Sequence, residues 1–122
     1  MKAYLAGGLS DWRTEVAAKL PDLTIHDPFF NSNQSAIYHF VGEDLFAVDE
    51  SDFVLAVVDY ERHTGTAVEL GFAHARNKPI YLVWLLDTPP DSMMVGISKK
   101  LFLSLDDAID HIDRRVLSEQ AR

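Results

Sequence analysis

Short apolar segments alternate with amphipathic segments along the whole chain. Two apolar runs, FVLAVVD at 53–59 and PIYLVWL at 79–85, are typical of strands buried on both faces. Three shorter apolar segments, at 3–6, 23–26 and 101–103, predict three more strands. Strands that alternate with helices predict an α/β domain with a mainly parallel sheet. Five such strands in this length favour a flavodoxin-like three-layer sandwich.

The intervals between these strands have helical patterns. Ser10 is suited to cap the first helix, and Pro21 follows its end. Ser104, with Asp107 three residues later, forms an Asp-containing capping box for the last helix. The expected helices span 10–20, 35–49 and 66–77 and begin again after Ser104, with DTPPDS at 87–92 as loop. Because no repeat or linker interrupts the pattern, we expect one domain over residues 1–122.

Ligands of open parallel sheets gather outside the carboxyl ends of the strands. The loops expected there are GGLSD, DPFFNSN, DYERHTG and DTPPDS. Their glycines would let backbone amides approach an anion, their aromatic residues would stack on a base, and their acids are further candidates. The candidate substrate contacts from these loops are Gly7, Gly8, Asp27, Phe29, Asp59 and Gly65. For Phe29 and Asp59, ordinary packing and turn capping are open alternatives.

Two acidic residues interrupt the apolar faces of their helices. Asp44 falls within a stripe formed by Ile37, Val41, Leu45 and Val48, whereas its neighbour Glu43 points elsewhere. Glu69 lies among small and apolar residues near the start of the helix at 66–77. A buried carboxylate costs several kcal/mol unless it is paired or used.

Both acids have a structural and a functional interpretation. They could lie at the margins of the apolar faces or near positive helix N-termini. Alternatively, two carboxylates near the carboxyl edge of the sheet could act as nucleophile and general acid, as in glycosidic-bond cleavage. The five histidines show no shared metal spacing, and His63 differs only because it precedes Glu69 by six residues.

Composition narrows the functional classes further. The chain has 122 residues, a formal charge of −8 and no cysteine. This charge argues against a nucleic-acid partner, and the lack of cysteine excludes disulfides and thiolate chemistry. The apolar runs are shorter than the roughly 20 residues that a membrane-spanning helix needs. We therefore expect a cytoplasmic protein without a membrane segment.

Several segments, in order, resemble the nucleoside 2-deoxyribosyltransferases and the related deoxynucleoside 5′-monophosphate N-glycosidases. They are YLAGGLSD, the ED pair at 43–44, DFVLAVVD, GTAVELGFAHARNKPIY and SMMV. The resemblance extends from residue 4 to about residue 98, and GTAVELGFAHA is its most specific part.

The resemblance implies roles for three residues. Glu69 would attack C1′ of the sugar, Asp44 would exchange a proton with the base, and Tyr4 would orient the nucleophile. The family also completes each pocket with an Asn-x-Met stretch from a neighbouring subunit. Here Ser92, or else Asp91, replaces that asparagine, and Met94 is the methionine. At least a homodimer with shared sites is therefore expected.

A second departure concerns the 5′ end of the sugar. Transferases tend to carry an aspartate six residues before the nucleophile, and this chain has His63 there. Because histidine and serine can accept a phosphate that an aspartate repels, the resemblance predicts tolerance of a 5′-phosphate. The leading interpretation implied by the resemblance is base exchange on a 2′-deoxynucleoside, with no metal and no organic cofactor. Nucleotide hydrolysis and a non-catalytic nucleotide-binding domain are the alternatives.

Overall fold

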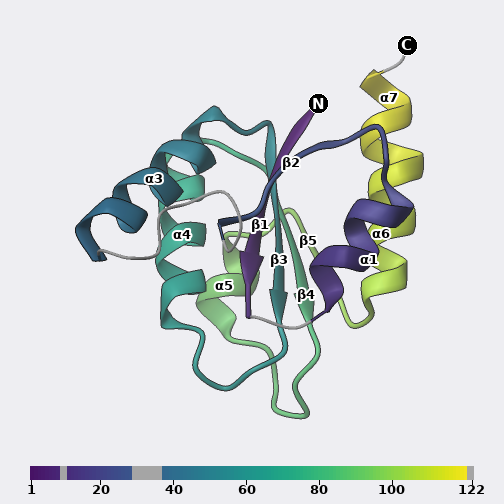
Figure 1. The fold of residues 1–122 in the computed structure, drawn as a ribbon. Coiled ribbons are helices and arrows are strands. Elements are labelled where there is room, and N and C mark those ends of the chain that lie inside the picture. The colour runs from purple at the N-terminus through teal and green to yellow at the C-terminus, as the bar shows by residue number, and fades with distance from the viewer. Residues whose placement is uncertain (9–10, 29–36, 121–122) are drawn as a thin grey trace.

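The computed structural model describes residues 1–8, 11–28 and 37–120, with helices on both sides of a sheet (Figure 1). The strands are β1 (Lys2–Gly7), β2 (Thr24–His26), β3 (Phe53–Val58), β4 (Ile80–Trp84) and β5 (Lys100–Phe102). Every pair is parallel, and their order is β2-β1-β3-β4-β5. This is the flavodoxin-like order, so the expected fold class is confirmed.

The helices form two layers. The first comprises α3 (Ile37–Glu50), α4 (Thr64–Ala75) and α5 (Ser92–Gly96). The second comprises α1 (Trp12–Lys19), α6 (Leu105–His111), the π-helix η1 (Ile112–Leu117) and α7 (Ser118–Gln120). The carboxyl ends of the strands all lie at the lower edge of the sheet in Figure 1. The loops named above therefore begin at one edge.

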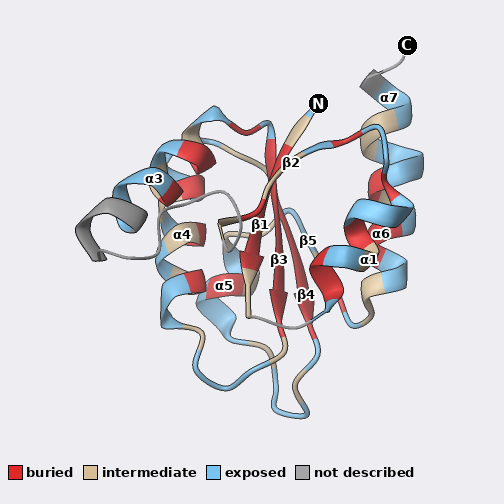
Figure 2. Cartoon of the chain, in the orientation of Figure 1, coloured by how far each residue is buried: buried red, intermediate tan, exposed pale blue. Residues whose placement is uncertain are grey.

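The central strands β1, β3 and β4 are buried on both faces, as their red colour in Figure 2 shows. In β3, Phe53, Leu55 and Val57 pack in the cluster beneath α1 and α6. The alternate residues of the same strand pack in the cluster beneath α3 and α4. Side chains of a strand alternate between its faces, so a central strand with two covered faces must be apolar throughout.

The buried face of α3 differs from the stripe predicted by the helical wheel. Asp44, Ala47 and Val48 are buried, whereas Val41 is 42% exposed. Leu45 is only partly buried, and the side chain of Ile37 lies outside the described part of the chain. The helix is thus rotated so that Asp44, Ala47 and Val48 are buried, the last two in the core beside the sheet. Glu43 is exposed, as expected.

The other observed helix and strand ends differ from the predicted ends by one or two residues, which is the usual uncertainty of such boundaries. Helix α4 begins at Thr64, and DTPPDS leads into the short helix α5, which was not predicted. Asp91 caps α5 by accepting hydrogen bonds from the backbone of Met93 and Met94. The cap at Ser104 is confirmed, since its hydroxyl accepts from the Asp107 backbone. Ser10 lies outside the described residues, and Asp11 is the N-cap of α1.

Candidate active site

Tyr4 and Glu69 meet between the sheet and α4. Tyr4 lies in the middle of β1 and is fully buried, with its ring stacked on His26 at a centroid distance of 5.6 Å. Its hydroxyl donates a hydrogen bond to a carboxylate oxygen of Glu69, in the second turn of α4. One oxygen of Glu69 is thus held by the rigid centre of the sheet.

A cavity of about 250 Å³ opens beside this pair at the carboxyl edge. Glu69 reaches it from α4, and Asp44 reaches it from α3. The other predicted site residues that line it are Gly7, Gly8, Asp59, His63 and Gly65. The fold therefore brings both out-of-pattern acids into one cavity, although 25 residues separate them in the sequence.

Burial controls the electrostatics of the pair. It raises the pKa of Glu69 to about 7, with a smaller contribution from the negative charge of Asp44. The hydrogen bond from Tyr4 and the positive charge of Arg13 act in the opposite direction on the pKa of Glu69. Burial and the neighbouring Glu69 carboxylate raise the pKa of Tyr4, which therefore remains a neutral donor. Glu69 is ionised in about half of the molecules near neutral pH.

Close packing requires glycine at position 7, the last residue of β1, and leaves little room beside Gly8. Gly7 has a φ of +147°, and a Cβ atom there would lie 2.3 Å from the carbonyl oxygen of Val57. A Cβ atom on Gly8 would lie 2.6 Å from a carboxylate oxygen of Asp59. A larger residue at position 7 would therefore push the end of β1 away from β3, whereas the Asp59 side chain could move aside for one at position 8.

Arg13 is a cavity residue that the sequence analysis did not single out. It is 6% exposed, and its guanidinium pairs with Asp27 at 2.8 Å. The same group donates to the carbonyl oxygens of Leu5 and Gly7, so it joins α1 to the end of β1. Asp27 does not line the cavity itself but pairs with Arg13, which does. A single arginine on a short helix carries no sequence signal for this role.

The geometry agrees with the family comparison. The model of the nucleoside 2-deoxyribosyltransferase family matches residues 3–105, which is most of the chain. The chain belongs to this family. No match was found among curated proteins.

Solved structures with the same fold include members with known chemistry. The 2-deoxyribosyltransferase of Bacillus psychrosaccharolyticus has a TM-score of 0.74 and 22% identity, over 90% of this chain and 91% of that one. A conserved protein from Enterococcus faecalis V583 has a TM-score of 0.78 and 18% identity, over 95% and 99%. The Clostridium botulinum CMP N-glycosidase BcmB has a TM-score of 0.67 and 16% identity, over 93% and 99%. These likenesses support the fold, while the family as a whole includes enzymes that act on nucleosides or nucleotides.

His63, the residue before α4, lines the cavity. Its ring packs edge-on against Trp84, with centroids 5.3 Å apart, and its Nδ1 lies 3.2 Å from the carbonyl oxygen of Tyr60. Arg62, which the sequence analysis did not select, also lines the cavity. Two adjacent residues with basic side chains thus line the cavity together with its acids.

The remaining predicted residues lie apart from this cavity. Asp91 and Met94 line a neighbouring hollow of about 490 Å³, which shares His63 with the first cavity. Ser92 begins α5 and lines neither. Phe29 lies outside the described residues. Within one subunit, the expected Asn-x-Met equivalent therefore does not reach Glu69.

Two negative findings concern the described residues only. In them, no group of three or more histidine, aspartate or glutamate side chains is arranged to hold a metal ion. Over the same ranges, every helix is too short or too polar to cross a bilayer.

Proposed function

We propose that this protein cleaves the N-glycosidic bond of 2′-deoxynucleosides and transfers the sugar to a second base. The observation that carries the proposal is the Tyr4–Glu69 hydrogen bond beside a cavity that Asp44 also lines. A pure binding protein has no need of a carboxylate held in this way. Family membership supports the same class of reaction.

The proposed reaction has two displacements. A carboxylate oxygen of Glu69 attacks C1′, and the bond between C1′ and the base nitrogen breaks with its electron pair going to the base. Asp44 gives its proton to that base. In the second displacement, a new base attacks C1′ and gives a proton to Asp44, and the ester to Glu69 breaks. Two inversions at C1′ retain its configuration.

The second candidate is hydrolysis of a deoxynucleoside 5′-monophosphate by the same covalent route. It is favoured by His63 and Arg62, because a phosphate dianion is attracted to basic donors. Water would then replace the second base. On this basis we also propose that the cavity accepts a 5′-phosphate better than a transferase with an aspartate at position 63.

Product analysis separates these reactions. Deoxynucleosides and their 5′-monophosphates would be incubated with and without a free acceptor base, and the products separated by chromatography. A new nucleoside that forms only with acceptor base supports transfer, whereas free sugar phosphate without acceptor supports hydrolysis. Equal rates for a nucleoside and its monophosphate, or slower cleavage of the monophosphate, would contradict the proposed phosphate preference.

Glu69→Gln tests the enzymatic proposal against the binding alternative. The variant keeps the size and the hydrogen-bond acceptor of the side chain but removes the nucleophilic carboxylate. We expect it to bind deoxynucleosides with nearly unchanged Kd while turnover is lost. Full turnover in Glu69→Gln would exclude the covalent route, and a parent protein that cleaves no nucleoside or nucleotide would favour the binding alternative.

We also propose that the protein forms at least a homodimer with shared sites. Support comes from large apolar side chains exposed on the adjacent helices α3, α4 and α5: Phe46 is 66% exposed, Val68 58% and Met93 77%. Met93→Glu should dissociate the subunits and reduce activity, as measured by light scattering and turnover. Leu103→Glu is the control. Leu103 is 70% exposed, but it follows β5 and does not belong to α3, α4 or α5. A fully active monomer would contradict shared sites.

A further inference from the structure

A second cavity, of about 410 Å³, lies at the opposite edge of the sheet from the candidate active site. Its floor comes from the amino ends of strands, with Phe53 beginning β3 and Pro79 preceding β4. One wall is the C-terminal helical segment, which contributes His111, Arg115 and Glu119. The volume falls within the roughly 300–1,000 Å³ that is usual for small-molecule sites. The proposed glycosidic chemistry does not use this cavity.

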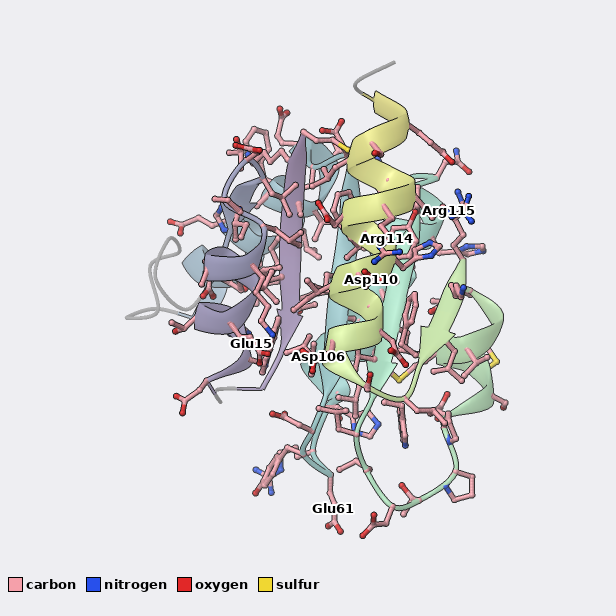
Figure 3. All side chains as sticks on the ribbon, turned by 90° about the vertical axis from the view of Figure 1, so that its right-hand side faces the viewer. Glu15, Glu61, Asp106, Asp110, Arg114 and Arg115 are labelled. Carbon is pink, nitrogen blue, oxygen red and sulfur yellow. The ribbon has the colours of Figure 1, made fainter. Side chains whose placement is uncertain are left out.

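The cavity gathers positive charge in an acidic protein. Lys99, Lys100 and Arg115 line it, and none of the three belongs to an ion pair within the described residues. Asp52 and Glu119 also line it, but Asp52 already accepts a hydrogen bond from the backbone of Lys2. In contrast, neighbouring Arg114 pairs with Asp110 at 2.8 Å and does not line this cavity, and Figure 3 shows the two side by side on the helix.

The pKa of His111 reflects the positive charges around this cavity. The pKa of His111 is below its usual value, first because of burial and then because of the charges of Lys100, Arg115 and Lys99. Glu119 acts in the opposite direction, but the three cations outweigh it. The imidazole is packed between the rings of Tyr81 and Phe102, at centroid distances of 5.6 and 5.4 Å. The imidazole of His111 therefore lies beside the cavity, in surroundings where positive charge predominates.

Lys99 and Lys100 are exposed residues at the start of β5. The amide of Lys99 donates to the carbonyl oxygen of Ile80 at 2.8 Å, and the ammonium of Lys100 lies over the ring of Phe102. Arg115 projects from the π-helix η1, away from Arg114 in Figure 3. π-helical turns are rare and frequently occur at functional sites, where they redirect side chains.

We propose that this cavity, defined by Lys99, Lys100, His111 and Arg115, is a binding site for a small phosphate monoester. Arginine can donate two hydrogen bonds to phosphate oxygens, and the two ammonium groups balance the dianionic charge. Phe53, Pro79 and Val116 provide an apolar surface for the rest of such a ligand. The site is separate from the Glu69 cavity, so it does not depend on the proposed reaction.

The imidazole of His111 provides a site-specific test by NMR titration. The probes are inorganic phosphate and ribose 5-phosphate, with ribose and sodium chloride at matched ionic strength as controls. Bound phosphate should offset the three cations, so the pKa of His111 should rise in a saturable manner with the two phosphates only. No change beyond that caused by sodium chloride, or an equal change with ribose, would overturn the proposal.

Three single substitutions test which basic side chains bind the phosphate. Lys99→Gln and Arg115→Gln should each weaken phosphate binding about tenfold or more, because each removes a charge-assisted contact. Arg114→Gln should leave Kd within about twofold, since its guanidinium is paired elsewhere. Thermal unfolding would confirm that all three variants fold. An equal loss of binding in Arg114→Gln would show only a diffuse charge effect and would overturn the proposal.

Discussion

The hydroxyl of Tyr4 donates a hydrogen bond to the carboxylate of Glu69, so the centre of β1 holds the side chain that enters the cavity from α4. The donor has no freedom to turn away, because Tyr4 is fully buried and its ring stacks on His26. One carboxylate oxygen is thereby fixed, and the other is the candidate nucleophile.

Tyr4→Phe should reduce kcat by about 10- to 100-fold, the usual value of a hydrogen bond to a charged group. The KM should change little, because the ring and the cavity walls are retained. Loss of the phenol should also raise the pKa of Glu69, since this hydrogen bond lowers it in the parent protein. Steady-state rates across pH would measure both effects. An unchanged pH profile would contradict the positioning role of Tyr4.

The rate should depend on ionisation of Glu69. Its pKa of about 7 means that kcat/KM should fall about tenfold per pH unit below neutrality. The profile in Glu69→Asp, if active, should move with the pKa of the new carboxyl group. A kcat/KM that stays constant between pH 5 and 7 would exclude Glu69 as the nucleophile.

Glu69 should also make stability depend on pH. Its folded pKa of about 7 exceeds the ordinary 4.5, so the folded state keeps its proton longer and loses stability as pH rises through this interval. The loss amounts to about 3 kcal/mol above pH 7. Glu69→Gln should therefore be more stable than the parent at pH 8, and nearly equal to it near pH 4. Urea unfolding at both values would measure the difference.

Asp44→Asn should slow base departure by roughly 10²- to 10⁴-fold, the range for a general acid. The adjacent Glu43→Gln is the control, because Glu43 is exposed on the same helix and does not line the cavity. The defect in Asp44→Asn should shrink with a substrate whose leaving group needs no proton. Equal slowing for both kinds of leaving group would point to a structural role for Asp44.

The buried pair of Arg13 and Asp27 should contribute strongly to stability. Arg13→Gln removes the cation that pairs with the buried Asp27 carboxylate, at a cost of about 3–5 kcal/mol in the free energy of unfolding. Arg76→Gln breaks the exposed pair with Asp49 and should cost no more than about 1 kcal/mol. Urea denaturation of both variants would compare them. Similar losses would show that burial does not govern the Arg13 pair.

The sequence alone determined the strands, their parallel arrangement in one sheet, and the helices that cover both faces of that sheet. Continuous apolar runs such as FVLAVV leave no polar face, and only a sheet covered on both sides accepts them. The same pattern made Asp44 and Glu69 conspicuous, since each is an acid among apolar neighbours. Local spacing and hydrophobicity suffice for such inferences because strand and helix periods are properties of the chain itself.

Tertiary structure alone decided how α3 is rotated, which side chains meet, and where the cations lie. Val41 was expected inside and is exposed, because packing against α4 and the sheet selects the face that is buried. Arg13 resembles any helical arginine until the fold brings Asp27 to it. Likewise, Lys99 and Lys100 at the start of β5 come near Arg115 of the π-helix only in the folded chain. These contacts link distant segments, and no local periodicity encodes the distance between them.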